Sequence, residues 1–124
     1  MKYKLIERAN PQDRTLVKWY ASPVNEGKIT QRDLAKDIVV NSSLSRGDIG
    51  NVIDNILDSM PKYLLMGKSV SLGEFGTLRL SFTSDGVSTA DEFNTNLING
   101  VKVVFTPSVE FKKTLDDIHF EKSE

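Results

Sequence analysis

The sequence contains no cysteine and only one histidine, His119, in 124 residues. Without cysteine the chain forms no disulfide bond, no thiolate zinc site and no cysteine nucleophile. A single histidine offers no cluster of imidazole ligands, and no serine lies in the strained, glycine-flanked turn that a serine nucleophile requires. We therefore expect no metal, no cofactor, no small-molecule substrate and no enzymatic activity.

Long apolar runs are absent as well. The longest runs in the sequence span a few residues, whereas a membrane-spanning helix needs about 20. Residues 1–7 carry charges where a signal peptide would have its apolar segment. These absences predict a soluble cytoplasmic protein with no membrane partner, and the missing cysteines agree with a reducing compartment.

A surplus of positive charge is the third absence. Lys and Arg number 16 against 17 Asp and Glu, which gives a net charge of −1. Proteins that bind nucleic acids usually carry a basic excess, because much of their affinity comes from neutralising phosphates and releasing counterions. Any DNA binding by this chain must therefore rest on a local patch of Lys and Arg.

The residues that are present suit one domain. A chain of 124 residues with 39% hydrophobic side chains has the size and content of a single core. Residues 2–8 and 16–21 are rich in the residue types that favour strands, and residues 10–13 between them form a turn signal. We expect an N-terminal strand pair, followed by a linker over residues 22–27.

Two helices are predicted next. Thr30 is a good N-cap with Asp33 at the third helical position, and Ser45 with Asp48 repeats the same spacing. After Ser45, apolar side chains recur at steps of three and four over residues 49–64, which is the strongest periodicity in the chain.

Two residues bear on where the second helix ends. Pro61 lies inside the periodic segment and predicts a kink or a break, because proline lacks the N–H of a helical hydrogen bond. Gly67 is a natural residue for the position just after a helix C-cap.

The hydrophobic period changes to two after Gly67. Apolar and polar residues alternate over residues 70–72, 77–82 and 101–105, as in half-buried antiparallel strands. Gly73 and Gly76 interrupt the first part and predict a bulge or a bend. Residues 83–99 are polar and poorly patterned, with a turn signal at Asp85-Gly86.

A third helix is expected to begin after Thr106, with Thr106 as its cap and Pro107 at its first position. The tail over residues 119–124 is expected to add a short strand. The apolar side chains expected to line the third helix are Val109, Leu115 and Ile118, with Phe111 nearby. The order of elements predicts an α+β fold with antiparallel pairing.

The segment Phe75-Gly76-Thr77-Leu78 resembles the signature of the bacterial HU and integration-host-factor (histone-like) proteins, in which an aliphatic residue precedes Phe-Gly-Thr. Residues 28–30 and 44–48 resemble the starts of the two family helices. Residues 64–72 resemble the segment that enters the arm hairpin, and residues 101–115 resemble the returning arm strand and the C-terminal helix. The strands before residue 28 are typical of a longer HU-like subfamily.

The resemblance implies one HU-like domain over residues 1–124, with an N-terminal strand extension (1–27) and a core (28–124) whose arm lies at about 80–100. It also implies an intertwined homodimer whose sheets form a saddle and whose two arms reach into the DNA minor groove. Family arms grip phosphate with basic residues and use a proline wedge to bend the duplex. The protein would then be a bacterial, nucleoid-associated, non-enzymatic architectural DNA-binding protein.

The predicted arm departs from this pattern. Residues 80–100 contain no Lys, Arg or Pro and carry Asp85, Asp91 and Glu92 instead. Phe93 or Leu97 would be the apolar wedge, with packing in a core or an interface as the alternative. Glu74 stands where the family usually has a small residue near the DNA backbone. An alternative function is therefore a structural or protein-interaction module that has lost DNA affinity.

Arg79 and Lys102 are the best candidates for phosphate contacts. Each alternates with apolar neighbours, so both belong on the polar face of the hairpin. The further candidates are Lys68, Arg46, Lys112 and Lys113, for each of which ordinary solvated charge is the alternative.

Overall fold

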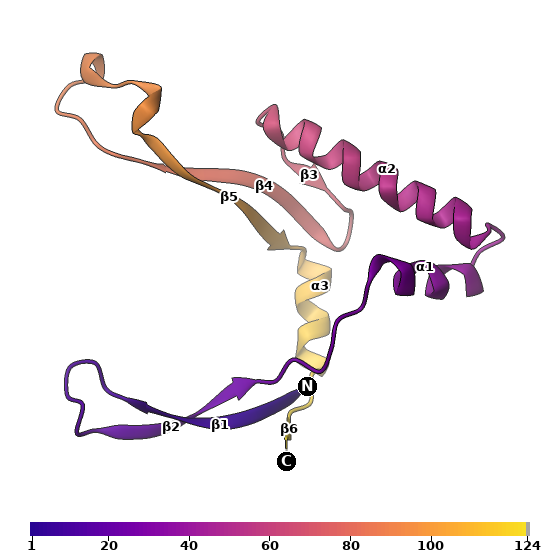
Figure 1. Cartoon of the computed structure of the whole chain (residues 1–124), viewed down its shortest axis with the longest axis horizontal. Helices are drawn as coiled ribbons and strands as arrows, with labels where there is room; N and C mark the ends of the chain where they lie inside the picture. The colour runs from indigo at the N-terminus through magenta and orange to yellow at the C-terminus, as the bar shows by residue number, and fades with distance from the viewer. Residues whose placement is uncertain (124) are drawn as a thin grey trace.

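The computed structural model describes residues 1–123 as a mixed α+β chain with two small sheets (Figure 1). The strands and α-helices are β1 (Lys2–Ala9), β2 (Val17–Pro23), α1 (Gln31–Val40), α2 (Arg46–Leu65), β3 (Val70–Ser71), β4 (Gly76–Ser84), β5 (Ile98–Pro107), α3 (Val109–Thr114) and β6 (Glu121–Lys122). One sheet has the strand order β2-β1-β6 and the other has the order β3-β4-β5. One-turn helices η1 (Ala90–Glu92) and η2 (Thr95–Leu97) lie between β4 and β5, and a third, η3 (Leu115–Asp117), follows α3.

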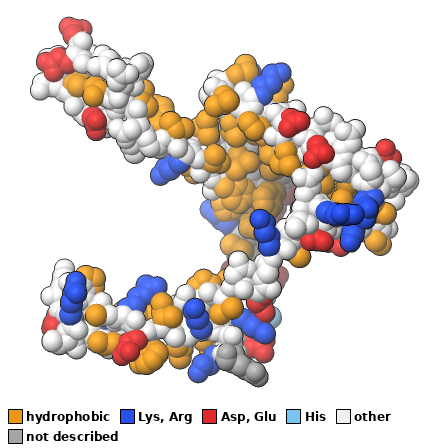
Figure 2. All heavy atoms as spheres, in the orientation of Figure 1, with side chains coloured by type: hydrophobic (Ala, Val, Ile, Leu, Met, Phe, Trp, Pro, Cys, Tyr) orange, Lys and Arg blue, Asp and Glu red, His pale blue; other side chains and the backbone are white. Residues whose placement is uncertain are grey.

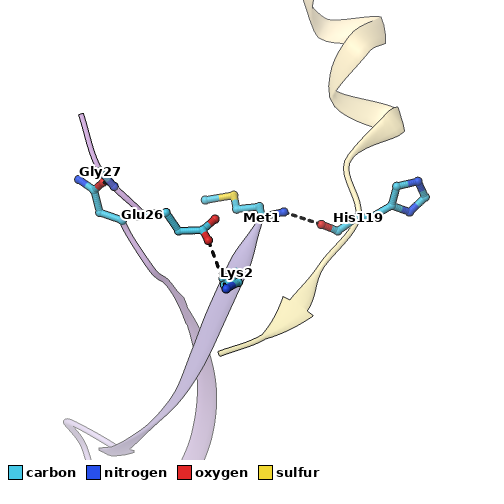
Figure 3. Close-up of polar contacts among 6 residues, drawn as sticks. Met1, Lys2, Glu26, Gly27 and His119 are labelled. Atoms are coloured by element: carbon cyan, nitrogen blue, oxygen red, sulfur yellow. Dashed lines mark hydrogen bonds and ion pairs between the residues drawn. The ribbon is translucent and has the colours of Figure 1, made fainter. Parts of the chain in front are cut away.

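The N-terminal sheet confirms both the strand pair and the short strand that the sequence predicts. β1 and β2 form an antiparallel ribbon, and β6 from the tail pairs with β1 in parallel. Figure 3 shows that the Met1 ammonium donates a hydrogen bond of 2.8 Å to the carbonyl oxygen of His119. The Lys2 ammonium lies 3.5 Å from the Glu26 carboxylate. The base of the β1–β2 ribbon is therefore linked both to the C-terminal tail at His119 and to the segment after β2 at Glu26.

The helix starts are confirmed at both predicted caps. At Thr30 and at Ser45 the side-chain oxygen accepts from the backbone N–H three residues later, while that residue's carboxylate accepts from the cap N–H. The backbone N–H and the hydroxyl of Thr30 both donate to Asp33, and they hold the pKa of that carboxyl below its usual range. Local chemistry thus fixes where α1 and α2 begin.

Helix α2 is continuous through Pro61, so the break that was predicted there as an alternative to a kink does not occur. The helix continues through Pro61 to Leu65, because the φ angle of proline suits a helix and only one hydrogen bond is lost. Gly67 directly follows the C-cap residue Met66, as predicted, and has a φ of +81°. Gly67 N–H donates to the Leu64 carbonyl and Lys68 N–H donates to the Tyr63 carbonyl, the Schellman pattern of a helix C-terminus.

The second sheet turns sharply before β4. The Leu72 N–H donates to the Gly76 carbonyl (2.8 Å), and Gly73 has a φ of +62° inside this turn. Gly76 itself has a φ of +153°, and a Cβ built there would lie 2.5 Å from the Thr106 carbonyl oxygen and 2.6 Å from the Phe105 ring. Only glycine fits where β4 approaches the Thr106 backbone and the Phe105 ring so closely, which explains why the Phe-Gly-Thr motif has glycine at this position.

The third helix begins later than predicted. Ser108, not Thr106, is its N-cap and accepts from the Phe111 N–H (3.0 Å), whereas Pro107 ends β5 opposite Gly76. Pairing of β5 with β4 extends the strand over residues that the sequence assigned to a helix start. The Ser108 hydroxyl also donates to the Glu74 carbonyl, which ties α3 to the turn before β4.

Aromatic packing joins the turn, β5 and α3. The Phe75 ring stacks on Phe105 at a centroid distance of 4.9 Å and meets the edge of Phe111 at 5.1 Å. The apolar residues predicted to line α3 do not form a buried stripe, because α3 ends at Thr114 and Leu115 and Ile118 lie beyond it, half exposed. Phe111 is the residue that anchors the helix.

Very little of the chain is buried. Within residues 1–123 the buried apolar side chains are Ala35, Ile49 and Leu64 alone. The accessible surface is 10,447 Å², whereas a compact monomer of this mass exposes about 6,700 Å². Figure 2 shows apolar side chains gathered on the visible face where β4, β5 and α2 come together. The fold leaves a large apolar surface without a partner inside the chain.

We predict that Gly76→Ala lowers the free energy of unfolding by about 3 kcal/mol, because the added methyl group meets the Thr106 backbone and forces a φ that alanine avoids. Gly86→Ala is the matched control, since a Cβ at Gly86 meets no atom within 4 Å and its φ is not positive. Urea unfolding of both variants at equal protein concentration measures the difference. Equal stability of the two variants would contradict the close contact between Gly76 and the Thr106 backbone.

Candidate functional site

The polar face of the β4–β5 ribbon carries the two main candidates. In the register of the pair, Arg79 lies opposite Val104 and Lys102 lies opposite Ser81. Residues opposite each other share a face, so Arg79 and Lys102 are diagonal neighbours on one face, as their alternation predicts. Both side chains are exposed, and they form a small basic patch.

The other face of this ribbon is apolar. Leu78 lies opposite both Val70 and Phe105, and Leu80 lies opposite Val103. Helix α2 lies on this side, since six of its residues, from Val52 to Tyr63 at helical spacing, line one hollow of about 430 Å³ together with the strand residues Val70 and Leu72. The patch of Arg79 and Lys102 therefore faces away from α2.

The remaining candidates lie on other elements. Lys68 precedes β3, and its ammonium is 5.9 Å from the centroid of the Tyr63 ring. Arg46 is the first residue of α2, at the end of that helix far from the arm (Figure 1), and lines a hollow with Arg32 of α1. Lys112 and Lys113 are exposed on α3. Arg46, Lys112 and Lys113 are not on the face that holds Arg79 and Lys102.

The arm is longer than its alternation indicates. β4 runs to Ser84 and β5 starts at Ile98, with a bulge between Ser81 and Thr83, and the Thr83 hydroxyl donates to the Asn99 side chain (2.7 Å). The Asp85 N–H then donates to the Leu97 carbonyl (3.0 Å) and closes the end of the ribbon.

The tip of the arm is acidic. Its charged side chains are Asp85, Asp91 and Glu92, and Figure 2 shows acidic groups at this end without a basic one beside them. Of the two apolar wedge candidates, Leu97 is half-buried while Phe93 is 43% exposed. The tip has no group that attracts phosphate.

A second basic face was missed by the sequence reasoning. The β1–β2 register places Arg8 opposite Lys18 and Lys4 opposite Ser22, so the three cations share one face. The signal was present, since Lys4 and Arg8 have the same parity in β1. Lys18 joins them only through the pairing between strands, which the sequence did not specify.

Among residues 1–123 no three His, Asp or Glu side chains lie together in a way that would hold a metal ion. None of the helices in this part of the chain combines the length and the apolar character needed to cross a membrane.

Comparisons with known proteins agree on the fold. A model of the HU-HIG family, described as an HU domain fused to wHTH, Ig, or a glycine-rich motif, matches residues 1–122. The crystal structure of a candidate DNA-binding protein from Bacteroides vulgatus ATCC 8482 is similar, with a TM-score of 0.62 and 15% identity. The similarity covers 98% of this chain and 47% of the other, so this chain spans about half of that protein. No curated protein matches.

We predict that Arg79→Gln and Lys102→Gln each change the free energy of unfolding by less than about 0.5 kcal/mol, because both side chains are exposed. Neither makes an ion pair within residues 1–123. Urea unfolding at fixed protein concentration checks this. A loss of more than about 1.5 kcal/mol would mean that the patch serves packing rather than a free surface.

Proposed function

Because the chain belongs to the HU-HIG family, we propose that it is a non-enzymatic, HU-like architectural protein that binds DNA as a homodimer without sequence preference. The family match confirms the resemblance drawn from the Phe-Gly-Thr motif and the helix order. In this proposal the protein acts in the cytoplasm of a bacterium, on the DNA of the nucleoid.

The observation that best supports DNA binding is that Arg79 and Lys102 are both exposed on one face of the β4–β5 ribbon. The two cations are diagonal neighbours on a ribbon whose opposite face is turned toward α2. Cations fixed on an exposed strand face are suited to backbone contacts, which position a protein on DNA without reading sequence. This patch supplies the local basic surface that a chain of net charge −1 requires.

The unpartnered apolar surface supports the homodimer. Side chains that would normally be internal are open to solvent, among them Val103 at 61% and Phe105 at 39% exposure on β5. The surplus of accessible surface exceeds what a standard interface buries on one partner, about 800 Å², and suits an obligate, intertwined pair. A second copy of the chain is the partner that the family resemblance implies.

The acidic tip favours a second candidate function. Asp85, Asp91 and Glu92 oppose phosphate where an HU arm would grip it. On this alternative the chain is a structural or protein-interaction module that keeps the HU-like scaffold and has little DNA affinity.

We predict that the chain binds duplex DNA tightly at low salt and that the affinity falls steeply as salt rises. The double variant Arg79→Gln/Lys102→Gln should flatten the slope of log affinity against log salt by about two, since each phosphate contact contributes about 0.9. Fluorescence anisotropy with two duplexes of unrelated sequence measures both the slope and the lack of preference.

The control for this titration is Lys36→Gln/Lys62→Gln, which removes the same charge from exposed positions on α1 and α2. It should bind with nearly the slope of the unmodified chain. Absence of binding by the unmodified chain at low salt would overturn the DNA-binding proposal and favour the second candidate.

We also predict that sedimentation equilibrium at micromolar concentration gives the mass of two chains. The melting temperature should rise with protein concentration, because association stabilises the folded state by mass action. A monomeric mass together with a concentration-independent melting temperature would contradict the homodimer.

A further inference from the structure

The two ribbons of the molecule carry opposite charge. The loop end of the β4–β5 arm, residues 83–100, has three acidic and no basic residues. The β1–β2 ribbon has the reverse balance, which Figure 2 shows as basic side chains spread along it. Its charged residues are Lys2, Lys4, Arg8, Arg14 and Lys18 against Glu7 and Asp13. Phosphate would be attracted to the ribbon that an ordinary HU core lacks.

Strand register concentrates this charge on one side of the ribbon. Arg8 lies opposite Lys18, and Lys4 precedes Arg8 by four residues on the same strand and face. At about 3.4 Å per residue, the cations extend over roughly 14 Å. We call the side defined by Lys4, Arg8, Lys18 and Tyr20 the basic face.

The cations of the basic face are free to bind an external anion. Lys2–Glu26 is the single ion pair among residues 1–123, so Lys4, Arg8 and Lys18 have no carboxylate partner within that part of the chain. All three side chains are exposed. The Arg8 guanidinium lies 5.7 Å from the centroid of the Tyr20 ring, which restricts its position without neutralising it.

The basic face also has a concave end. Arg8, Lys18 and Tyr20 border a hollow of about 440 Å³ together with residues of the hairpin loop. A cation on each strand and an aromatic ring beside them make a surface that suits a sugar–phosphate chain. The opposite side of the ribbon differs, since Leu5, Trp19 and Ala21 make it apolar.

We propose that the basic face of the β1–β2 ribbon is a second DNA contact surface, at which Lys4, Arg8 and Lys18 bind the phosphodiester backbone. This inference rests on the proposed function, because it assigns the ribbon a share of the same DNA contact. It accounts for how a chain with an acidic arm tip and no net positive charge binds DNA. The β1–β2 ribbon supplies phosphate contacts that the tip of the β4–β5 arm lacks, in addition to those of Arg79 and Lys102.

The test is a salt titration of DNA binding by the triple variant Lys4→Gln/Arg8→Gln/Lys18→Gln in the full chain. The slope of log affinity against log salt should become shallower by about two to three, and the affinity at about 0.1 M salt should fall at least roughly tenfold. The matched control Lys28→Gln/Lys36→Gln/Lys62→Gln removes the same charge at exposed positions off the ribbon, and it should leave the slope nearly unchanged.

A charge-preserving variant, Lys4→Arg/Arg8→Lys/Lys18→Arg, should bind within about twofold of the unmodified chain, because the contact is with phosphate charge rather than with a base. Circular dichroism checks that each variant is folded. Should the triple glutamine variant unfold, Lys4→Gln and Lys18→Gln replace it, each flattening the slope by about one.

The outcomes separate this inference from the proposed function. If the unmodified chain binds DNA and the folded glutamine variants keep the slope of the control, the ribbon proposal is overturned while DNA binding stands. A chain that does not bind DNA at low salt overturns both. Loss of slope in Lys4, Arg8 and Lys18 variants that adds to the loss in Arg79→Gln/Lys102→Gln supports two separate contact surfaces.

Discussion

The close approach of Gly76 to the backbone of Thr106 sets the geometry of the second sheet. Because no side chain fits between these strands, Gly76 stays opposite Pro107, and the pairs that follow along β4 and β5 keep their places. A slip by one residue would turn Arg79 toward α2 and expose Leu78 in its place. The stacked rings of Phe75 and Phe105 stabilise the same contact between Gly76 and β5. The position of every exposed cation on this ribbon depends on that contact.

Features that the sequence predicted correctly are those whose cause is local. Thr30 and Ser45 cap their helices through bonds to residues three positions later, and Gly67 ends α2 through its own backbone angle. Two of the departures, at Pro107 and at Lys18, arose where pairing between distant segments decides. Pro107 belongs to β5 because Gly76 lies opposite it, which outweighs its preference for a helix start. Likewise, the cross-strand position of Lys18 beside Arg8 depends on the hairpin loop between them.

Charge is distributed in this molecule by ribbon rather than over the whole surface. The acidic arm tip and the basic N-terminal ribbon largely cancel in the net charge, so the total says little about what any one surface attracts. The fold fixes where each ribbon projects, while the residues on each exposed face determine what that face attracts. In each ribbon, strand pairing therefore sets the fold, whereas the exposed side chains set the charge that a binding partner meets.

The pairing of β6 with β1 gives the N-terminal ribbon a second tether. The Glu121 N–H donates to the Met1 carbonyl and the Ser123 N–H donates to the Tyr3 carbonyl, so the ribbon is held from α3 as well as from the segment that leads to α1. Only two residues pair there, against seven between β1 and β2. Such a short, exposed junction opens more easily than the ribbon itself. Opening of this junction would release the base of the ribbon from the α3 side while the seven pairs between β1 and β2 stay formed.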